Sequence, residues 1–311
     1  MVITNTADLI GQSASMSRLR SYIQKVAATD SNVLITGETG TGKERVSESI
    51  HRASARARQP LVCINCAAIP DGLFESELFG YERGAFTGAQ VSFPGKLRLA
   101  HRGTVLLDEI GEMTPYAQAK LLRVIESREV FPLGASRAHL IDVRFIAATN
   151  QDLEPLVMQN RFRKDLYYRF NVARIPLVPL RERKEDIPDL FAHFLAQYNT
   201  HYRFQVPGPD AELTQRLLQY DWPGNVRELR NLVEAVFIDP PSNPIAFSDL
   251  PESFQQIFSG YESTVSGERE RLIAVLAATH WNKSQAAAEL HWSRMTLYRK
   301  LAKYQLQDQG R

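Results

Sequence analysis

The strongest chemical signal in this chain lies at residues 37–44, GETGTGKE, which directly follow an apolar run. Glycines in such a loop let successive backbone N–H groups wrap a chain of phosphates, and Lys43 can reach the β- and γ-phosphates. The spacing predicts a phosphate-binding loop rather than an ordinary glycine-rich turn. Glu44 stands where a hydroxyl residue usually contacts Mg²⁺, which leaves the details of metal coordination open. The predicted nucleotide-binding residues of this segment are Gly37, Glu38, Thr39, Gly40, Thr41, Gly42, Lys43 and Glu44.

Two adjacent carboxylates, Asp108 and Glu109, end a second apolar run. Asp108 is suited to hold Mg²⁺, directly or through water, and Glu109 to polarise a water for in-line attack on a γ-phosphate. Taken alone, a strand end of this kind is often only a solvated edge. Because this one follows Lys43 by 65 residues in an alternating pattern of strands and helices, it predicts the metal ligand and general base of the phosphate site.

Short aliphatic runs alternate with longer amphipathic stretches between residues 32 and 150, as in a parallel α/β sheet. The expected strands are 32–36, 61–65, 104–108 and 143–147, and the expected helices are 43–55, 71–79, 115–128 and 161–170. Beyond residue 185 no convincing strand remains, and the expected helices are 187–198, 211–220, 226–236, 268–279, 284–290 and 294–303. The predicted units are an α/β P-loop core at 1–180, a helical lid at 181–238, a linker at 239–266 and a small all-α domain at 267–311.

Length and composition indicate a soluble protein of about two domains, with 44% hydrophobic residues to build its cores. The net charge is only +2, but six Lys or Arg against two Asp or Glu lie between Trp281 and Arg311, where a DNA contact would use them. The start of the chain lacks a basic leader and no apolar run is long enough for a bilayer, so we expect a cytoplasmic protein without membrane contact. Cys63 and Cys66 form a lone C-x-x-C, interpreted as a reduced, packed pair rather than a zinc or redox site.

The hexapeptide at 84–89 serves no purpose in nucleotide chemistry. It consists of Gly84, Ala85, Phe86, Thr87, Gly88 and Ala89. Together with the phosphate loop and the acidic strand end, it resembles the signature loop of bacterial enhancer-binding proteins, the AAA+ ATPases that activate sigma-54 RNA polymerase. The resemblance implies that this loop contacts the sigma factor and is raised or lowered by the nucleotide state. The alternative is an ordinary glycine-flanked turn that exposes a phenylalanine.

The same resemblance implies roles for polar residues around the phosphate site. Asn65 would bond Glu109 and hold it off until the partner is engaged, and Asn150, with Thr149, would sense the γ-phosphate. Arg227, in the first turn of a helix after Trp-Pro-Gly-Asn, would read the nucleotide from the lid. Strand-end capping is the alternative for Asn65 and Asn150.

Two arginines six residues apart, Arg163 and Arg169, lie in the segment FRKDLYYRF. The resemblance implies that they act as fingers across a subunit boundary, where a guanidinium stabilises the charge of the transferring phosphoryl group. Hydrolysis would then depend on assembly. Without the resemblance, they would be interpreted as exposed arginines on an amphipathic helix.

The C-terminal residues have helix-turn-helix spacing, with an alanine-rich helix, a break at His291-Trp292 and a second helix. The segment resembles the Fis-type DNA-binding domain, although His291 stands where glycine is usual, so the turn geometry is open. Ser293 would cap the recognition helix. An amphipathic protein-binding helix is the alternative. The predicted DNA-binding residues are Ser293, Arg294, Thr296, Tyr298 and Arg299.

The family resemblance implies a sigma-54-dependent activator that uses ATP and Mg²⁺ and whose partners are sigma-54 RNA polymerase holoenzyme and upstream double-stranded DNA. It also implies a homo-oligomer, a dimer on DNA and a hexameric ring. Only 36 residues precede Gly37, too few for the regulatory domain of most relatives. Four alternatives stay open: constitutive competence, restraint by a separate protein, control through expression, and a truncation. The rival functions are a non-transcriptional AAA+ remodeller and a DNA-binding regulator whose nucleotide site is only structural.

Overall fold

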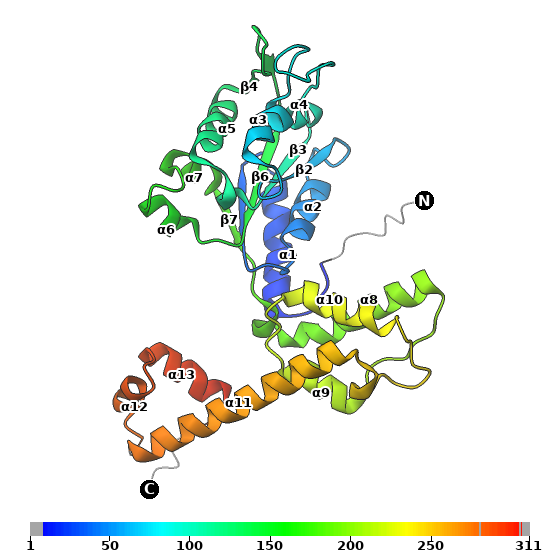
Figure 1. Ribbon diagram of the computed structural model, residues 1–311, viewed down its shortest axis with the longest axis vertical. Helices are drawn as coiled ribbons and strands as arrows, with labels where there is room; N and C mark the ends of the chain where they lie inside the picture. Colours follow the sequence, from blue (N-terminus) through cyan, green and yellow to red (C-terminus); the bar gives the residue numbers. More distant parts are fainter. Residues whose placement is uncertain (1–8, 280, 305, 307–311) are drawn as a thin grey trace.

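The computed structural model describes residues 9–279, 281–304 and 306, and its upper part is an α/β unit (Figure 1). Five parallel strands form its sheet in the order β2-β3-β6-β1-β7. Their sequences are largely aliphatic because helices cover both faces of a parallel sheet. The strands are β1 Val33–Thr36, β2 Leu61–Asn65, β3 Thr104–Asp108, β6 Arg144–Thr149 and β7 Ala173–Pro176.

Alternate residues of the strands belong to two separate cores, one on each face of the sheet. On β3, Val105 and Leu107 join one cluster and Leu106 joins the other. The first cluster packs against α3 Asp71–Phe79, α5 Pro115–Ser127 and α7 Lys164–Phe170, and the second against α1 Ala14–Ala27 and α2 Lys43–Ala53. The other short helices of this unit are α4 Lys96–Leu99, η1 Ile110–Glu112 and α6 Leu153–Met158.

The predicted α/β architecture is confirmed, with differences at the ends of several elements. The helix predicted at 161–170 is wrong at its start, because Arg163 is the N-cap and α7 begins at Lys164. Helix α1 and strand β7 were not predicted. A two-stranded hairpin, β4 Glu129–Val130 with β5 His139–Leu140, was also missed because each of its strands has only two residues, too few for a periodic signal.

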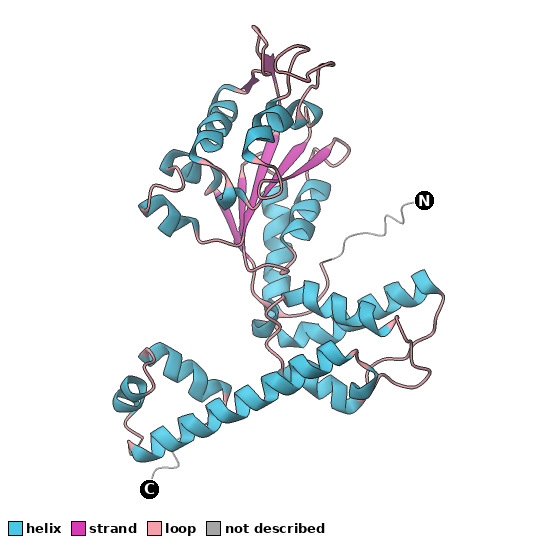
Figure 2. Ribbon diagram, in the orientation of Figure 1, coloured by secondary structure: helices cyan, strands magenta, loops and turns pink. Residues whose placement is uncertain are grey.

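A helical unit follows the sheet and matches the predicted lid. Its core surrounds Trp222, which is fully buried and whose indole N–H donates to the carbonyl of Leu217 at 2.8 Å. Figure 2 shows that this part contains helices and loops without strands. Its elements are η2 Leu180–Glu182, η3 Lys184–Asp186, α8 Ile187–Tyr202, α9 Ala211–Gln219, α10 Asn225–Val236 and η4 Phe247–Asp249.

Helix α11, Glu252–Ala278, replaces most of the linker predicted at 239–266. The prediction gave too much weight to the prolines, all of which precede the helix; Pro251 occupies its N-cap, where proline is tolerated. Phe258 on this helix is 2% exposed and packs against Tyr220 and Trp222 of the lid. Burial of this aromatic ring therefore stabilises a helix in a segment whose composition suggested a linker. The division of the chain into units at 180, 238 and 266 remains a prediction.

Helices α12 Lys283–Glu289 and α13 Arg294–Lys303 complete the chain and fold back on the end of α11 (Figure 1). Their small core contains Leu272 and Leu276 of α11 with Ala286, Leu290 and Leu297. The two predicted helices here are confirmed to within a residue at each end. None of the helices in the described part of the chain has the length and apolar character needed to cross a membrane.

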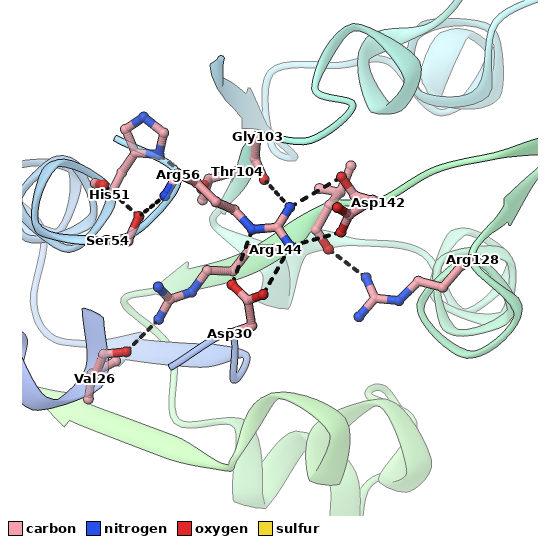
Figure 3. Close-up of polar contacts among 11 residues, drawn as sticks. Val26, Asp30, His51, Ser54, Arg56, Gly103, Thr104, Arg128, Asp142 and Arg144 are labelled. Carbon is pink, nitrogen blue, oxygen red and sulfur yellow. Dashed lines mark hydrogen bonds and ion pairs between the residues drawn. The ribbon is translucent and has the colours of Figure 1, made fainter. Parts of the chain in front are cut away.

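Figure 3 shows a charged network at the amino-terminal edge of the sheet, opposite the phosphate loop. Arg56 bonds Asp30 at 3.1 Å and Asp142 at 2.8 Å, and donates to the carbonyl of Gly103. Arg144, 1% exposed, donates to the carbonyl of Val26 at 2.9 Å. These bonds tie the chain segments that enter β1, β3 and β6 to one another.

Candidate functional site

The phosphate loop joins the end of β1 to the start of α2, at the carboxyl-terminal edge of the sheet. The amide of Gly37 donates to the carbonyl of Thr149 on the adjacent β6 at 3.2 Å. Lys43 is 7% exposed, and its ammonium donates to the carbonyl of Gly37 at 3.0 Å. The Lys43 Nζ atom also lies 3.4 Å from Oε1 of Glu109. The lysine and the second carboxylate singled out in the sequence are therefore brought together.

The acidic pair lies at the end of β3, beside the loop. Glu109 adopts a left-handed backbone (φ 52°), and its Oε2 accepts the amide N–H of Asn150 at 3.0 Å. Burial raises the pKa of Asp108, and the neighbouring negative charge of Glu109 raises it further. A half-buried carboxyl group with this electrostatic cost suits a divalent cation, because the cation would compensate the charge. Asp108 and the adjacent loop therefore fit the predicted Mg²⁺ position.

Asn150 and Asn65 differ in how they meet the site. The Nδ2 of Asn150 donates to the hydroxyl of Thr39 in the phosphate loop at 3.1 Å, so the residue bridges the loop and Glu109. Asn65 is the register partner of Asp108, but its Oδ1 accepts the amide N–H groups of Ala67 and Ala68, both at 3.0 Å. In this structure Asn65 therefore caps the turn after β2 and forms no described bond to Glu109.

The lid contacts the phosphate loop directly, through the predicted Arg227 and through Arg181 and Asn225, which the sequence did not single out. Arg181 forms a bidentate ion pair with Glu38, with N–O distances of 2.7 and 2.5 Å, and this pairing lowers the pKa of the Glu38 carboxyl group. Asn225 is fully buried, and its Nδ2 also donates to Glu38, at 3.2 Å. The amide of Arg227 donates to the carbonyl of Gly40 at 3.3 Å. The predicted second sensor therefore begins next to the loop.

Gly40 shows how closely the lid approaches. Its φ is 79°, and an added Cβ would lie 2.2 Å from the carbonyl oxygen of Gly224. No side chain fits there. The proline and glycine before α10 could have indicated that the backbone of the lid lies close to the phosphate loop. No local sequence pattern indicated that the side chain of Asn225 faces this loop.

Arg163 is the N-cap of α7 and Arg169 lies in its last turn, and α7 packs on the face of the sheet opposite to α2. Arg163 is 45% exposed and pairs with Asp165 at 2.7 Å; Arg169 is 57% exposed and pairs with Glu126 at 2.9 Å. Among the described contacts, neither arginine touches the phosphate loop. An open depression beside them is lined by Arg163, Lys164, Asp165 and Tyr168. Both guanidinium groups are therefore available at a surface, which a role across a subunit boundary requires.

The loop at 84–89 belongs to an insertion between β2 and β3, at the end of the α/β unit remote from the lid (Figure 1). The amide of Gly84 donates to the carbonyl of Ala89 at 2.9 Å, which closes the loop on itself. Phe86 is 44% exposed and packs edge-on against Tyr81, with 5.0 Å between ring centroids, while Thr87 is exposed. The amide of Glu82 donates to Leu133 in the β4–β5 hairpin segment. The predicted Phe-Thr tip therefore stands out from a small supported base.

The C-terminal helices have the geometry expected of the predicted DNA-binding unit. The Ser293 hydroxyl caps α13 by accepting the amide N–H of Thr296 at 3.1 Å. His291 has φ 55°, so the turn keeps the left-handed conformation for which glycine is usual. Leu297 and Leu301 point into the small core, and the exposed predicted DNA-binding side chains of this helix are Arg294, Tyr298 and Arg299.

The two cysteines lie on either side of the end of β2. Cys63 is exposed and Cys66 is buried, and both are free thiols. Burial raises the pKa of Cys66 to about 12. Although the Cys63 residue is exposed, partial loss of solvent around its thiol and the nearby carboxylates of Glu44, Glu48 and Asp108 raise its pKa to about 11. Because the thiolate is the reactive form, both groups are poor nucleophiles near neutral pH.

These features define the class of the protein: an α/β P-loop core with a helical lid, followed by helix-turn-helix helices. Three family profiles match in the same order: the Sigma-54 interaction domain at residues 9–176, the AAA+ ATPase lid domain at 181–267, and the Bacterial regulatory protein, Fis family, at 267–304. The chain belongs to the family of sigma-54-dependent transcriptional regulators and carries a DNA-binding helix-turn-helix.

Named relatives agree with this assignment. The transcriptional regulatory protein ZraR of Escherichia coli (strain K12) is 44% identical over 302 residues, which cover 95% of this chain and 68% of that protein. The regulatory protein AtoC of the same organism is 42% identical, over 95% of this chain and 67% of its own length. The crystal structure of NtrX from Brucella abortus in complex with ATP has a TM-score of 0.73 at 35% identity, and covers 96% of this chain and 69% of that one.

Asp108→Asn should stabilise the nucleotide-free protein at neutral pH. Because its folded pKa is raised above 3.8, the stability linked to the protonated carboxyl group is fully present below that pH and is lost as the pH rises through the folded pKa. At pH 7 we expect a melting temperature higher by roughly 1–3 °C than in the wild type, and no difference below about pH 3.8. Thermal unfolding followed by circular dichroism measures this, with the exposed Asp239→Asn as control; a lower melting temperature at pH 7 would contradict the electrostatic account.

His291→Gly should stabilise the C-terminal helices by about 0.5–1 kcal/mol, because glycine adopts the left-handed backbone without a Cβ clash. His291 is exposed, so its removal loses little packing. His291→Val should instead destabilise them, because a β-branched residue is strongly disfavoured at this φ. Amide hydrogen exchange in α12 and α13 of the whole chain distinguishes the two substitutions, and equal protection in both variants would show that the backbone conformation carries no cost.

Proposed function

We propose that this chain hydrolyses ATP with Mg²⁺ and uses the energy to remodel the closed complex of sigma-54 RNA polymerase at promoters. One observation carries the proposal: Lys43, Asp108, Glu109 and Asn150 converge at the edge of the same sheet whose β2–β3 insertion presents the Phe-Thr loop. Nucleotide binding is supported by the similarity to NtrX, whose structure holds ATP.

The chemistry assigned to each residue follows from its position. Lys43 and the loop amides would bind the phosphates, and Asp108 would hold a Mg²⁺ ion, which would neutralise charge on them. Glu109 takes the proton of the attacking water. In the present conformation its carboxylate is engaged by Lys43 and by the Asn150 amide. Nucleotide entry would draw Lys43 toward the phosphates and release Glu109 for this task, while Asn150 stays positioned to report the γ-phosphate.

The phosphate site and the loop proposed to contact the sigma factor are connected directly through the chain. The insertion leaves the sheet at Asn65, which lies beside Asp108, and returns to it at Thr104, the opposite end of β3. A change at the acidic strand end therefore acts directly on one root of the insertion that carries Phe86 and Thr87. We propose that Asn65 takes part in this coupling by exchanging its turn bonds for one to Glu109 in another nucleotide state.

Assembly completes the proposal. Arg163 and Arg169 are exposed and would enter the nucleotide site of a neighbouring subunit, as expected for a ring, with a hexamer as the family expectation. The helix-turn-helix would bind upstream DNA as a dimer through α13, and a separate regulatory protein is one candidate for control. A non-transcriptional remodeller is not favoured, because the chain carries both the sigma-54 interaction and Fis-family regions.

Thr87→Ala should separate hydrolysis from its use. None of the described contacts joins this loop to the phosphate site, so we expect most of the ATP hydrolysis to persist while open-complex formation falls by at least about tenfold. ATPase rate and open-complex formation are measured on the same preparation, with ring assembly checked separately. Glu109→Gln is the matched control, because it should bind ATP but not turn it over. Promoter opening by Thr87→Ala at the wild-type rate would show that the loop is not the coupling element.

Mixing inactive variants tests catalysis across the subunit boundary. Lys43→Ala cannot bind nucleotide productively, and Arg163→Ala or Arg169→Ala cannot complete a neighbour's site. In an equimolar mixture with Lys43→Ala, roughly a quarter of the sites pair an intact loop with an intact finger, so activity should return to about that fraction. Mixing Lys43→Ala with Glu109→Gln is the control, since both residues act within one subunit and no rescue is expected. An arginine variant without rescue does not act in trans.

A further inference from the structure

The carboxylate of Glu38 lies within the phosphate loop, and the described bonds to it come from residues that follow the β-sheet in the sequence. Arg181 pairs with both of its oxygens, at 2.7 and 2.5 Å, and Asn225 donates to Oε2 at 3.2 Å. Arg181 belongs to η2, immediately after the α/β unit, and Asn225 begins α10 of the lid. Two segments separated by more than forty residues therefore meet on one side chain of the loop.

Asn225 connects three parts of the chain through one buried amide group. Its Oδ1 accepts the N–H of Leu180 in η2 at 2.8 Å, and its Nδ2 donates to the carbonyl of Thr39 at 3.1 Å as well as to Glu38. The residue is fully buried and has a left-handed φ of 52°. Loss of any of these bonds would leave a buried polar group unsatisfied, so the arrangement is held as a unit.

The backbone of the loop is held in the same way. The carbonyl of Gly40 accepts the amide N–H of Arg227, and the carbonyl of Thr41 accepts Nη2 of Arg183 at 3.2 Å. Residues 38 to 41 therefore each bond a residue of η2, α10 or the segment between η2 and η3. The shape of the loop and the position of the lid are linked by direct contacts.

We propose that Arg181 and Asn225 are positioning residues for nucleotide binding: Arg181 neutralises Glu38, and both residues hold the phosphate loop in the shape that accepts a triphosphate. The inference rests on the ATPase proposed above and adds the means by which the lid sets nucleotide affinity. A free carboxylate in this loop would repel the phosphates, and Arg181 removes that repulsion by pairing with it. By linkage, a nucleotide that favours this loop shape also favours this lid position.

The test is a double-mutant cycle on the full chain, read as the dissociation constant of a fluorescent ATP analogue with Mg²⁺. Arg181→Ala should weaken binding roughly three- to tenfold, because it leaves Glu38 charged and unpaired beside the phosphates. Glu38→Ala should weaken binding less. The double variant should return to the affinity of Glu38→Ala, because the charge that Arg181 neutralises is gone. A merely structural loss would instead make the double variant weaker than Arg181→Ala.

Controls separate this effect from a general loss of the lid. Glu212→Ala breaks a lid ion pair with Arg216, which involves none of the residues that bond the phosphate loop, and should leave nucleotide affinity unchanged. Arg181→Lys keeps the charge without the bidentate fork and should fall between wild type and Arg181→Ala. Thermal unfolding verifies that each variant is folded; if Arg181→Ala is not, Arg181→Gln takes its place with the same expected order.

The outcomes also separate this inference from the proposed function. If wild type binds nucleotide and opens promoters but Arg181→Ala and Arg181→Gln bind as tightly as wild type, the positioning role is overturned and the function stands. If wild type binds nucleotide without hydrolysis or promoter opening, the proposed function fails, while the cycle still supports or overturns the role of Arg181. A wild type that binds no nucleotide overturns both.

Discussion

A parallel sheet brings the carboxyl ends of its strands to one edge, and the candidate site depends on that constraint. In the order β2-β3-β6-β1-β7, the strands that end at Thr36, Asp108 and Thr149 are immediate neighbours. The phosphate loop, the acidic pair and Asn150 therefore meet although they are far apart in sequence. The 3.4 Å contact between Lys43 and Glu109 is the direct result, and it joins the proposed phosphate-binding group to the proposed base.

Aromatic burial decides how the rest of the chain is attached. Trp222 fills the centre of the lid. Phe258 of α11 packs against Trp222 and against the neighbouring Tyr220. Because α11 continues without a break from this contact to the helix-turn-helix, the DNA-binding helices are carried on a rigid element anchored in the lid (Figure 2). A flexible linker would leave their orientation free; a continuous helix with a buried anchor restricts it.

Much of the site could be predicted because its signals are local. The GETGTGKE loop needs glycines and a lysine at fixed spacing, and the carboxylates at Asp108 and Glu109 end an aliphatic run, so both patterns are visible within ten residues. The 84–89 loop and the cap at Ser293 are equally local. The roles proposed for Arg163 and Arg169 rest on the family resemblance, and they would concern a neighbouring subunit, which one chain does not contain.

The sequence by itself determined the phosphate loop, the acidic strand end, the exposed Phe-Thr tip and the two last helices, since each depends on residues adjacent in the chain. Only the tertiary structure decided that the predicted linker is helical, because burial of Phe258 outweighs the weak local preference of its segment. It also decided that Asn65 bonds nearby turn amides, and that Arg181 and Asn225 bind Glu38. Such contacts join residues distant in sequence, and they form where the folded backbone brings a charge or an amide within hydrogen-bonding distance of a partner that no local pattern specifies.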